Sequence, residues 1–293
     1  MGKGDNKAGM LFLVGTPIGN LKDITLRALE VLQEVDLIAA EDTRQTRKLL
    51  NHYNIHKPIT SYFEHNKVFK GAYLLEDLRQ GKNIALVSDA GMPGISDPGA
   101  DVVRLCIEQN IMVTVVPGPS AVLTALVASG LDCNGFLFAG FFPRTKKEKK
   151  QLWEELGREK RTLIFYESPH RLVQTLGDLL EVWGDRNCCV ARELTKVFEE
   201  YRRGRLSEVR EYYQDRAVKG EVVLLVEGAS QENASGQSSA DRTPEEIERC
   251  YNALLEQGYE RKAALKEAAR MLRLPKREVY QVLVEKRKNN EEE

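Results

Sequence analysis

The sequence predicts an α/β protein with two domains and a C-terminal helical extension. The chain has 293 residues, a length that suits about two domains. Short apolar runs alternate with helical patterns up to about residue 227, which is typical of sheets covered by helices. Residues 229–242 contain no bulky apolar side chain, and helical patterns resume after them. We therefore expect α/β domains at 10–118 and 119–228, a flexible linker at 229–242 and a basic helical extension at 243–288.

Composition narrows the class of protein. The net charge is −1, so only local patches can argue for a nucleic-acid partner. The five cysteines form no Cys-x-x-Cys pair, which argues against a disulfide framework or zinc site and suits a reducing compartment. No apolar run reaches the ~18 residues of a membrane helix, and the N-terminus has no apolar signal core. We expect a cytoplasmic protein without membrane contact or bound metal.

The first domain should contain a mostly parallel sheet with helices on both faces. Apolar runs predict its strands at 11–14, 37–40, 59–62, 84–87 and 113–116. In a parallel sheet the carboxyl ends of all strands lie at one edge. The loops at 15–20, 41–44 and 88–99 each follow one of these strands, so we expect them to converge on a ligand.

The second domain should contain a mixed sheet. Apolar runs predict its strands at 136–139, 162–166, 188–191, 198–205 and 221–227. The strands after Val190 are short and adjacent in sequence, which favours antiparallel pairing. The segment 144–161 is strongly charged and carries four close lysines, for which a solvated helix face and an RNA contact are equally good explanations. These are Lys146, Lys147, Lys149 and Lys150.

The loop at 88–99 has the composition of a ligand site rather than of an ordinary turn. Glycine lets the backbone approach a ligand closely and proline fixes φ, so such a loop is shaped before its ligand arrives. Its special residues are Gly91, Gly94, Gly99, Pro93, Pro98, Asp89 and Asp97. The first strand is followed by no Gly-x-Gly-x-x-Gly, and no Walker lysine pattern occurs. These absences argue against nicotinamide and P-loop nucleotide chemistry.

Clusters that mix acids and bases follow three predicted strands, at 41–44, 167–171 and 192–196. Helix capping and surface ion pairs would explain one such cluster. Three clusters at equivalent positions favour a cleft shared by the two domains.

Five motifs occur in order along the chain: VGTPIGNL at 14–21, AEDTR at 40–44, VSDAGMPGISDPG at 87–99, PGPSA at 117–121 and FYESPHR at 165–171. Together they resemble the small-subunit ribosomal RNA (cytidine-2′-O)-methyltransferases of the tetrapyrrole methylase superfamily. The resemblance implies two α/β domains with S-adenosylmethionine in the cleft between them, usually in a homodimer. It also implies methylation of the ribose 2′-hydroxyl of a cytidine in the decoding region of 16S rRNA, with the small ribosomal subunit as partner.

Carried over by motif, the resemblance places the cofactor against the loops of both domains. The absence of lysine and arginine from 84–103 suits a positively charged cofactor better than a pyrophosphate. The expected cofactor-binding residues are Thr16, Pro17, Asp89, Ala90, Gly91, Pro93, Ile95, Ser96, Ser120, Ala121, Tyr166 and Ala191.

A ribose hydroxyl is a weak acid, so its methylation calls for a base or a nearby cation. Asp42 and Glu41 are the first candidates for the base. Arg44, Arg192 or Lys196 would hold phosphate or lower the pKa of the hydroxyl, and Glu167 and His170 are the next choice of catalytic residues.

RNA binding would have to come from local charge. Besides the lysines of 144–161, the basic segments are 202–205 and the tail at 261–288, which has ten Lys or Arg against three acids. The tail also has the spacing of a helix-turn-helix unit. Two other functions stay open: a tetrapyrrole C-methyltransferase on the same fold, and a DNA-binding regulator whose α/β body senses a metabolite.

Overall fold

The computed structural model describes residues 8–229, 243–272, 274, 276 and 279–283. The chain forms two compact units, residues 1–228 and 229–293. The first unit holds both predicted sheets, so the expected division at residue 118 stays a prediction. Most of the expected linker, residues 230–242, lies outside the described residues. No helix in the described part of the chain is long and apolar enough to cross a membrane.

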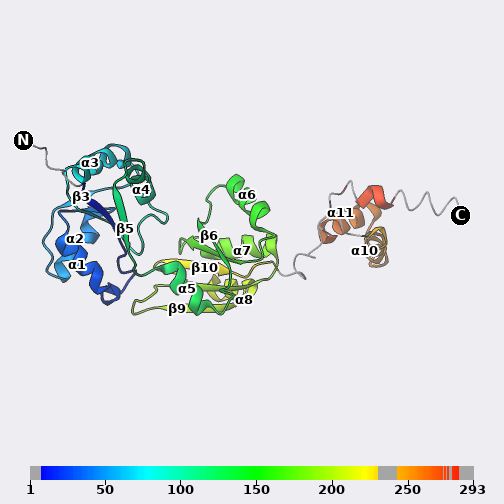
Figure 1. Cartoon of the computed structure of the whole chain (residues 1–293). Helices are drawn as coiled ribbons and strands as arrows, with labels where there is room; N and C mark the ends of the chain where they lie inside the picture. The colour runs from blue at the N-terminus through cyan, green and yellow to red at the C-terminus, as the bar shows by residue number, and fades with distance from the viewer. Residues whose placement is uncertain (1–7, 230–242, 273, 275, 277–278, 284–293) are drawn as a thin grey trace, which may run out of the picture. The chain divides into compact units, whose positions relative to one another are not determined.

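The first sheet was predicted to be mostly parallel, and all its strand pairs are parallel, in the order β3-β2-β4-β1-β5. Its strands are β1 (Met10–Val14), β2 (Leu37–Ala40), β3 (Ile59–Ser61), β4 (Ile84–Val87) and β5 (Met112–Val116). Helices α1 (Leu26–Glu34) and α2 (Thr43–His52) pack on one face, and α3 (Lys67–Arg79) and α4 (Gly99–Glu108) on the other (Figure 1). Alternate strand residues pack into the hydrophobic cores on the two faces of the sheet, because successive side chains of a strand point to opposite faces.

The second sheet is mixed, as predicted, in the order β6-β7-β10-β8-β9. Its strands are β6 (Phe136–Phe141), β7 (Thr162–Glu167), β8 (Asn187–Arg192), β9 (Glu200–Arg205) and β10 (Val222–Val226). Helix α5 (Ala121–Ser129) covers one face, and α6 (Lys146–Leu156), α7 (Leu172–Trp183) and α8 (Leu206–Gln214) cover the other. The middle strand β10 is buried at all five positions.

Two element boundaries have clear local causes. Helix α3 begins at Lys67, because the Asn66 side chain accepts a hydrogen bond from the Phe63 amide (2.9 Å) and holds a turn before it. Strand β6 continues past residue 139 to Phe141 through a register shift, where Gly140 has φ of 73°. This irregularity redirects the end of β6.

The C-terminal unit has its own small core. Thr243 caps α10 (Pro244–Glu256) in a capping box with Glu246, and Pro244 opens the helix. Helix α11 (Arg261–Leu272) follows, and residues 276 and 279–283 are helical. Several basic positions of the tail lie outside the described residues, namely Arg273, Arg277, Lys286, Arg287 and Lys288.

Candidate active site

The loops after β1 and β4 are joined by backbone hydrogen bonds. The Thr16 amide donates to the Gly91 carbonyl (2.9 Å) and the Gly91 amide donates to the Thr16 carbonyl (3.1 Å). The Thr16 hydroxyl also donates to the Ser88 carbonyl (3.2 Å), and Thr16 is buried. Thr16 therefore fixes the shape of the β4–α4 loop from behind.

The β4–α4 loop is braced internally. The carboxylate of Asp97 accepts hydrogen bonds from the amides of Gly94 (2.9 Å) and Gly99 (2.7 Å). Burial raises the pKa of Asp97. Gly91 has φ of 84° and Ser96 has φ of 65°, so both occupy the left-handed region, which is uncommon for serine. The loop is thus held in one conformation, as its glycines and prolines predicted.

The end of β2 lies against this loop. The Asp42 amide donates to Oδ1 of Asp89 (2.8 Å), so the predicted convergence of 41–44 and 88–99 is confirmed. Burial and the nearby carboxylate of Asp89 raise the pKa of Glu41. Asp42 instead caps α2 at the Arg44 amide (2.8 Å) and pairs with the Arg44 guanidinium (2.7 Å). These bonds to Arg44 lower the pKa of Asp42 to about 2.

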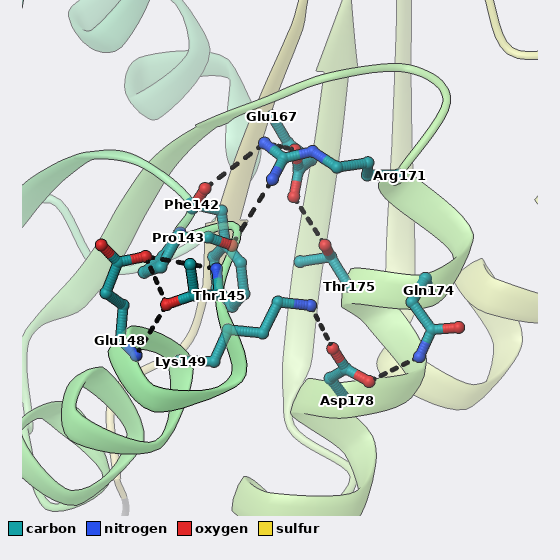
Figure 2. Close-up of polar contacts among 10 residues, drawn as sticks. All are labelled: Phe142, Pro143, Thr145, Glu148, Lys149, Glu167, Arg171, Gln174, Thr175 and Asp178. Carbon is teal, nitrogen blue, oxygen red and sulfur yellow. Dashed lines mark hydrogen bonds and ion pairs between the residues drawn. The ribbon is translucent and has the colours of Figure 1, made fainter.

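The end of β7 brings a buried ion pair to the same region. The Glu167 side chain is fully buried and pairs with Arg171 (2.6 Å), while Thr175 donates its hydroxyl to the other carboxylate oxygen (2.5 Å) (Figure 2). Beside it, the rings of Phe141 and Tyr166 lie 5.3 Å apart. The irregular end of β6 is what places Phe141 against Tyr166.

The loop after β1 also contacts the loop after β8. The Asn20 amide donates to the Thr195 hydroxyl (2.9 Å). Lys196 in this loop pairs with Glu193 (2.8 Å) and Glu221 (3.0 Å). Its ammonium group is therefore neutralised by two carboxylates rather than presented alone to a phosphate.

A cavity of about 460 Å³ lies among these loops, within the usual range of ligand pockets. Loops that follow strands of the first sheet line it together with strand residues of β7 and β10. Of the predicted site residues, those in its wall are Glu41, Asp89, Ala90, Gly91, Ile95, Ser96, Ser120, Ala121, Tyr166 and Glu167. The predicted residues outside its wall are Thr16, Pro17, Pro93, Ala191, Asp42, Arg44 and Lys196.

Some wall residues were not among the predicted ones. They include Phe141, Arg144, Arg171, Leu194 and residues 220–223. The motif FYESPHR contained Arg171, and the cluster at 192–196 contained Leu194, so both carried a signal. Arg144 belonged to the charged segment 144–161, which was weighed as an RNA contact and not as part of a cavity. Residues 220–223 carried no signal, because only the fold brings them to the cavity.

Two further sequence candidates have other roles. Arg192 pairs with Glu200, which also accepts hydrogen bonds from Tyr212 (2.9 Å) and Tyr213 (3.1 Å). His170 is exposed and lies outside the cavity wall. Among the described residues, no group of three or more His, Cys, Asp or Glu side chains could hold a metal ion.

The family model of the tetrapyrrole (corrin/porphyrin) methylases matches residues 10–210. The chain belongs to the tetrapyrrole methylase family. A Halalkalibacterium halodurans relative of this methylase, named "Ribosomal RNA small subunit methyltransferase I", is 48% identical over 275 residues, 94% of each chain. A Thermotoga maritima protein of the same name is 48% identical over 220 residues, 75% of this chain and 99% of its own. These relatives confirm the resemblance carried by the five motifs.

The fold of the methylase is shared by more distant proteins. The crystal structure of diphthine synthase superposes with a TM-score of 0.60 at 14% identity, covering 76% of this chain and 91% of that one. The two-sheet α/β architecture expected from the resemblance is therefore confirmed.

Replacing Gly19 by alanine should weaken both folding and the site. A Cβ there would lie 2.5 Å from the Leu194 carbonyl oxygen and 2.7 Å from the Thr195 hydroxyl. Backbone on one side leaves little room for adjustment, so we expect a loss of about 1–3 kcal/mol in the free energy of unfolding. Urea titration measures the loss. Gly130→Ala separates the effect of a clash from that of backbone strain, because a Cβ at Gly130 would have no atom within 4 Å while its φ is 80°. Equal cofactor affinity for Gly19→Ala and the wild type would contradict a role of this contact in the site.

Proposed function

We propose that this chain transfers a methyl group from S-adenosylmethionine to the ribose 2′-hydroxyl of a cytidine in the decoding region of 16S rRNA. The observation that carries the proposal is the 48% identity over 94% of the chain to a relative named for small-subunit rRNA methylation. The motif resemblance supplies the finer statement about the cytidine ribose. We also propose, from the same resemblance, that the enzyme is a homodimer.

The cavity suits a sulfonium cofactor. Its wall combines the carboxylates of Glu41, Asp89 and Asp97 with apolar side chains such as Ile95 and Phe141. Carboxylates favour a positively charged sulfur, and the apolar walls suit an adenine ring. The wall also holds two cationic side chains. Arg171 is paired with Glu167, and Arg144 is outnumbered by the three carboxylates.

When bound, S-adenosylmethionine supplies an electrophilic methyl group for an in-line displacement. The protein must then position the ribose and accept its proton. Glu41 is the wall residue suited to accept that proton, because burial and Asp89 raise its pKa above the ordinary glutamate value of 4.5. Asp89 also fixes the turn that carries Glu41 through its bond to the Asp42 amide.

The test is tritiated methyl transfer into 30S subunits, naked 16S rRNA and a tetrapyrrole in parallel. We expect label in the rRNA, at a cytidine ribose after nuclease digestion. Label in the tetrapyrrole alone would favour the C-methyltransferase alternative. Binding of duplex DNA in preference to 30S subunits, without label in any substrate, would favour the regulator.

Deleting residues 241–293 should weaken binding to the subunit and make that binding less dependent on salt. The tail carries ten Lys or Arg against three acids from 261 to 288, and lost phosphate contacts reduce the salt slope. Cofactor binding should persist, since the cavity residues all lie within the first unit. Filter binding across a salt series and calorimetry with S-adenosylmethionine measure the two effects. An unchanged salt slope would make the tail a cap that serves stability only.

A further inference from the structure

Three cations in the segment from Arg144 to Lys147 have no partner of opposite charge among the residues that the structure describes. Arg144 lines the cavity, and Lys146 and Lys147 are exposed on the first turn of α6. Within the described part of the chain, none of the three forms an ion pair or a side-chain hydrogen bond. We call Arg144, Lys146 and Lys147 the basic rim of the cavity.

The basic rim is placed where it disfavours its own helix. Positive charge near a helix N-terminus opposes the helix dipole, and each such charge costs about 0.3–1 kcal/mol at low ionic strength. The acid of this turn, Glu148, is already used in the capping box, where it accepts from the Thr145 hydroxyl (2.7 Å). Capping therefore holds the start of α6 in place despite its lysines, and an external anion would remove the unfavourable charge.

The segment that carries the basic rim is anchored to the buried ion pair of the cavity wall. Arg171 donates to the carbonyls of Phe142 (3.3 Å) and Pro143 (3.4 Å) while it pairs with Glu167 (Figure 2). The residues immediately before Arg144 are thus fixed to the wall, so the rim begins at the cavity itself.

Lys149, unlike the rim lysines, has an acidic partner, and that pair shows which side of α6 packs against the protein. Its ammonium group pairs with Asp178 of α7 (2.7 Å), and the two side chains are 15% and 16% exposed. Gln174 donates to the other oxygen of Asp178 (2.6 Å) (Figure 2). This buried contact fastens one side of α6 to α7 and leaves Lys146 and Lys147 in solvent.

The other basic segment of the first unit is used internally. The Arg202 guanidinium stacks on Tyr212, with 4.2 Å to the ring centroid. Arg203 donates to the Ala128 carbonyl (3.0 Å), and Arg205 donates to the Asp185 carbonyl (2.7 Å). Arg202, Arg203 and Arg205 keep their charge, but contacts inside the first unit hold their side chains in place. The side chains of the basic rim have no such contact among the described residues and are free to reach a ligand. The Thermotoga maritima relative is about as long as this unit and is also named as an rRNA methyltransferase. This favours an RNA contact within the first unit.

We infer that the basic rim binds the phosphate backbone of the rRNA beside the nucleotide that enters the cavity. The inference rests on the proposed function and assigns the substrate a surface. Single-sign, exposed cations with no partner are what a phosphate backbone requires, and Arg144 connects that surface to the cavity. Lys146 and Lys147 would act by holding the substrate, not in the methyl transfer itself.

The test compares Lys146→Ala/Lys147→Ala with Arg158→Ala/Lys160→Ala in the full-length protein. The control pair is exposed in the segment that follows the C-terminal end of α6, and neither residue has an ion-pair partner among the described residues. For the rim variant we expect the slope of log affinity against log salt for naked 16S rRNA to fall by about 1.4–1.8. That corresponds to roughly a tenfold smaller loss of affinity between about 50 and 200 mM salt. KM for 30S subunits should rise while kcat and S-adenosylmethionine affinity stay at wild-type values.

Three outcomes would overturn the inference. They are an unchanged salt slope for the rim variant, an equal change for the control variant, and weakened 30S binding with unchanged binding of naked rRNA. The last outcome would indicate a ribosomal protein as the partner. The salt slopes test the rim by binding alone, independently of methyl transfer. If the wild type methylates no rRNA, that result refutes the proposed function and leaves the test of the rim intact.

Discussion

Glu41→Gln should lower kcat for methyl transfer by roughly 10²- to 10⁴-fold, the usual contribution of a general base. The amide keeps the size of the side chain but cannot accept the proton of the ribose hydroxyl. Affinity for S-adenosylmethionine should change little, because Asp89 and Asp97 keep their charges in the cavity wall.

The pH dependence should identify Glu41 as well. Burial and Asp89 raise the pKa of this carboxyl, so the wild-type rate should fall as pH drops through a value above the ordinary 4.5. Glu41→Gln should lack this acidic limb. Because the folded state raises the pKa of Glu41, the ionised form of this side chain disfavours folding. The stability that the protonated form contributes is lost as pH rises through the raised pKa. The variant should therefore be at least as stable as the wild type at neutral pH.

Asp42→Asn is the matched control for Glu41→Gln. Asparagine caps helices as well as aspartate does, so α2 should persist without the charge. The pKa of Asp42 is about 2, and so low a value makes it a poor proton acceptor. We expect the control to retain most of its turnover. A large loss in Asp42→Asn with near-normal turnover in Glu41→Gln would return the base to Asp42.

Arg171→Met should destabilise the first unit by about 3 kcal/mol, the low end for breaking a buried ion pair. The methionine would leave the fully buried carboxylate of Glu167 without its cation. Thr175 and the Ser168 amide (2.6 Å) would still donate to that carboxylate, which limits the loss. For a unit of 228 residues the expected fall in Tm is about 6–12 °C.

Glu167→Gln separates the charge from the packing. It removes the buried carboxylate, and the Arg171 side chain, 30% exposed, can still reach water. We therefore expect a smaller fall in Tm than for Arg171→Met, measured by calorimetry on both variants. Equal Tm values for Arg171→Met and the wild type would show that the pair is dispensable for stability. The same outcome would mean that the segment at 142–145 needs no anchor.

The elements and their convergence were predictable because the relevant signals are local. Apolar runs such as Ile84–Val87 predict buried strands, and a parallel sheet places the ends of its strands at one edge. That rule alone predicted that residues 41–44 lie beside the loop at 88–99, where the Asp42 amide donates a hydrogen bond to Asp89.

The cavity wall was less predictable because part of it depends on irregular backbone. Phe141 reaches Tyr166 only through the register shift in β6. Gly140 signals an irregular strand at this point, but it does not tell which side chain the shift brings to the cavity. Charge was visible in the sequence, but its neutralisation was not. Lys196 is paired with Glu221, 25 residues further along the chain and next to β10, so its availability depends on strand order.

The place of β10 in the second sheet has a consequence for biosynthesis. A nascent chain emerges N-terminus first, and its first sheet is complete at Val116. The second sheet lacks its middle strand until Val226 has been made, so β7 and β8 each keep an unpaired inner edge until then. Unpaired edges invite strand addition from a neighbouring chain. Synthesis that stops before β10 would therefore leave an aggregation-prone product, and completing residues 220–226 closes both edges and the cavity wall together.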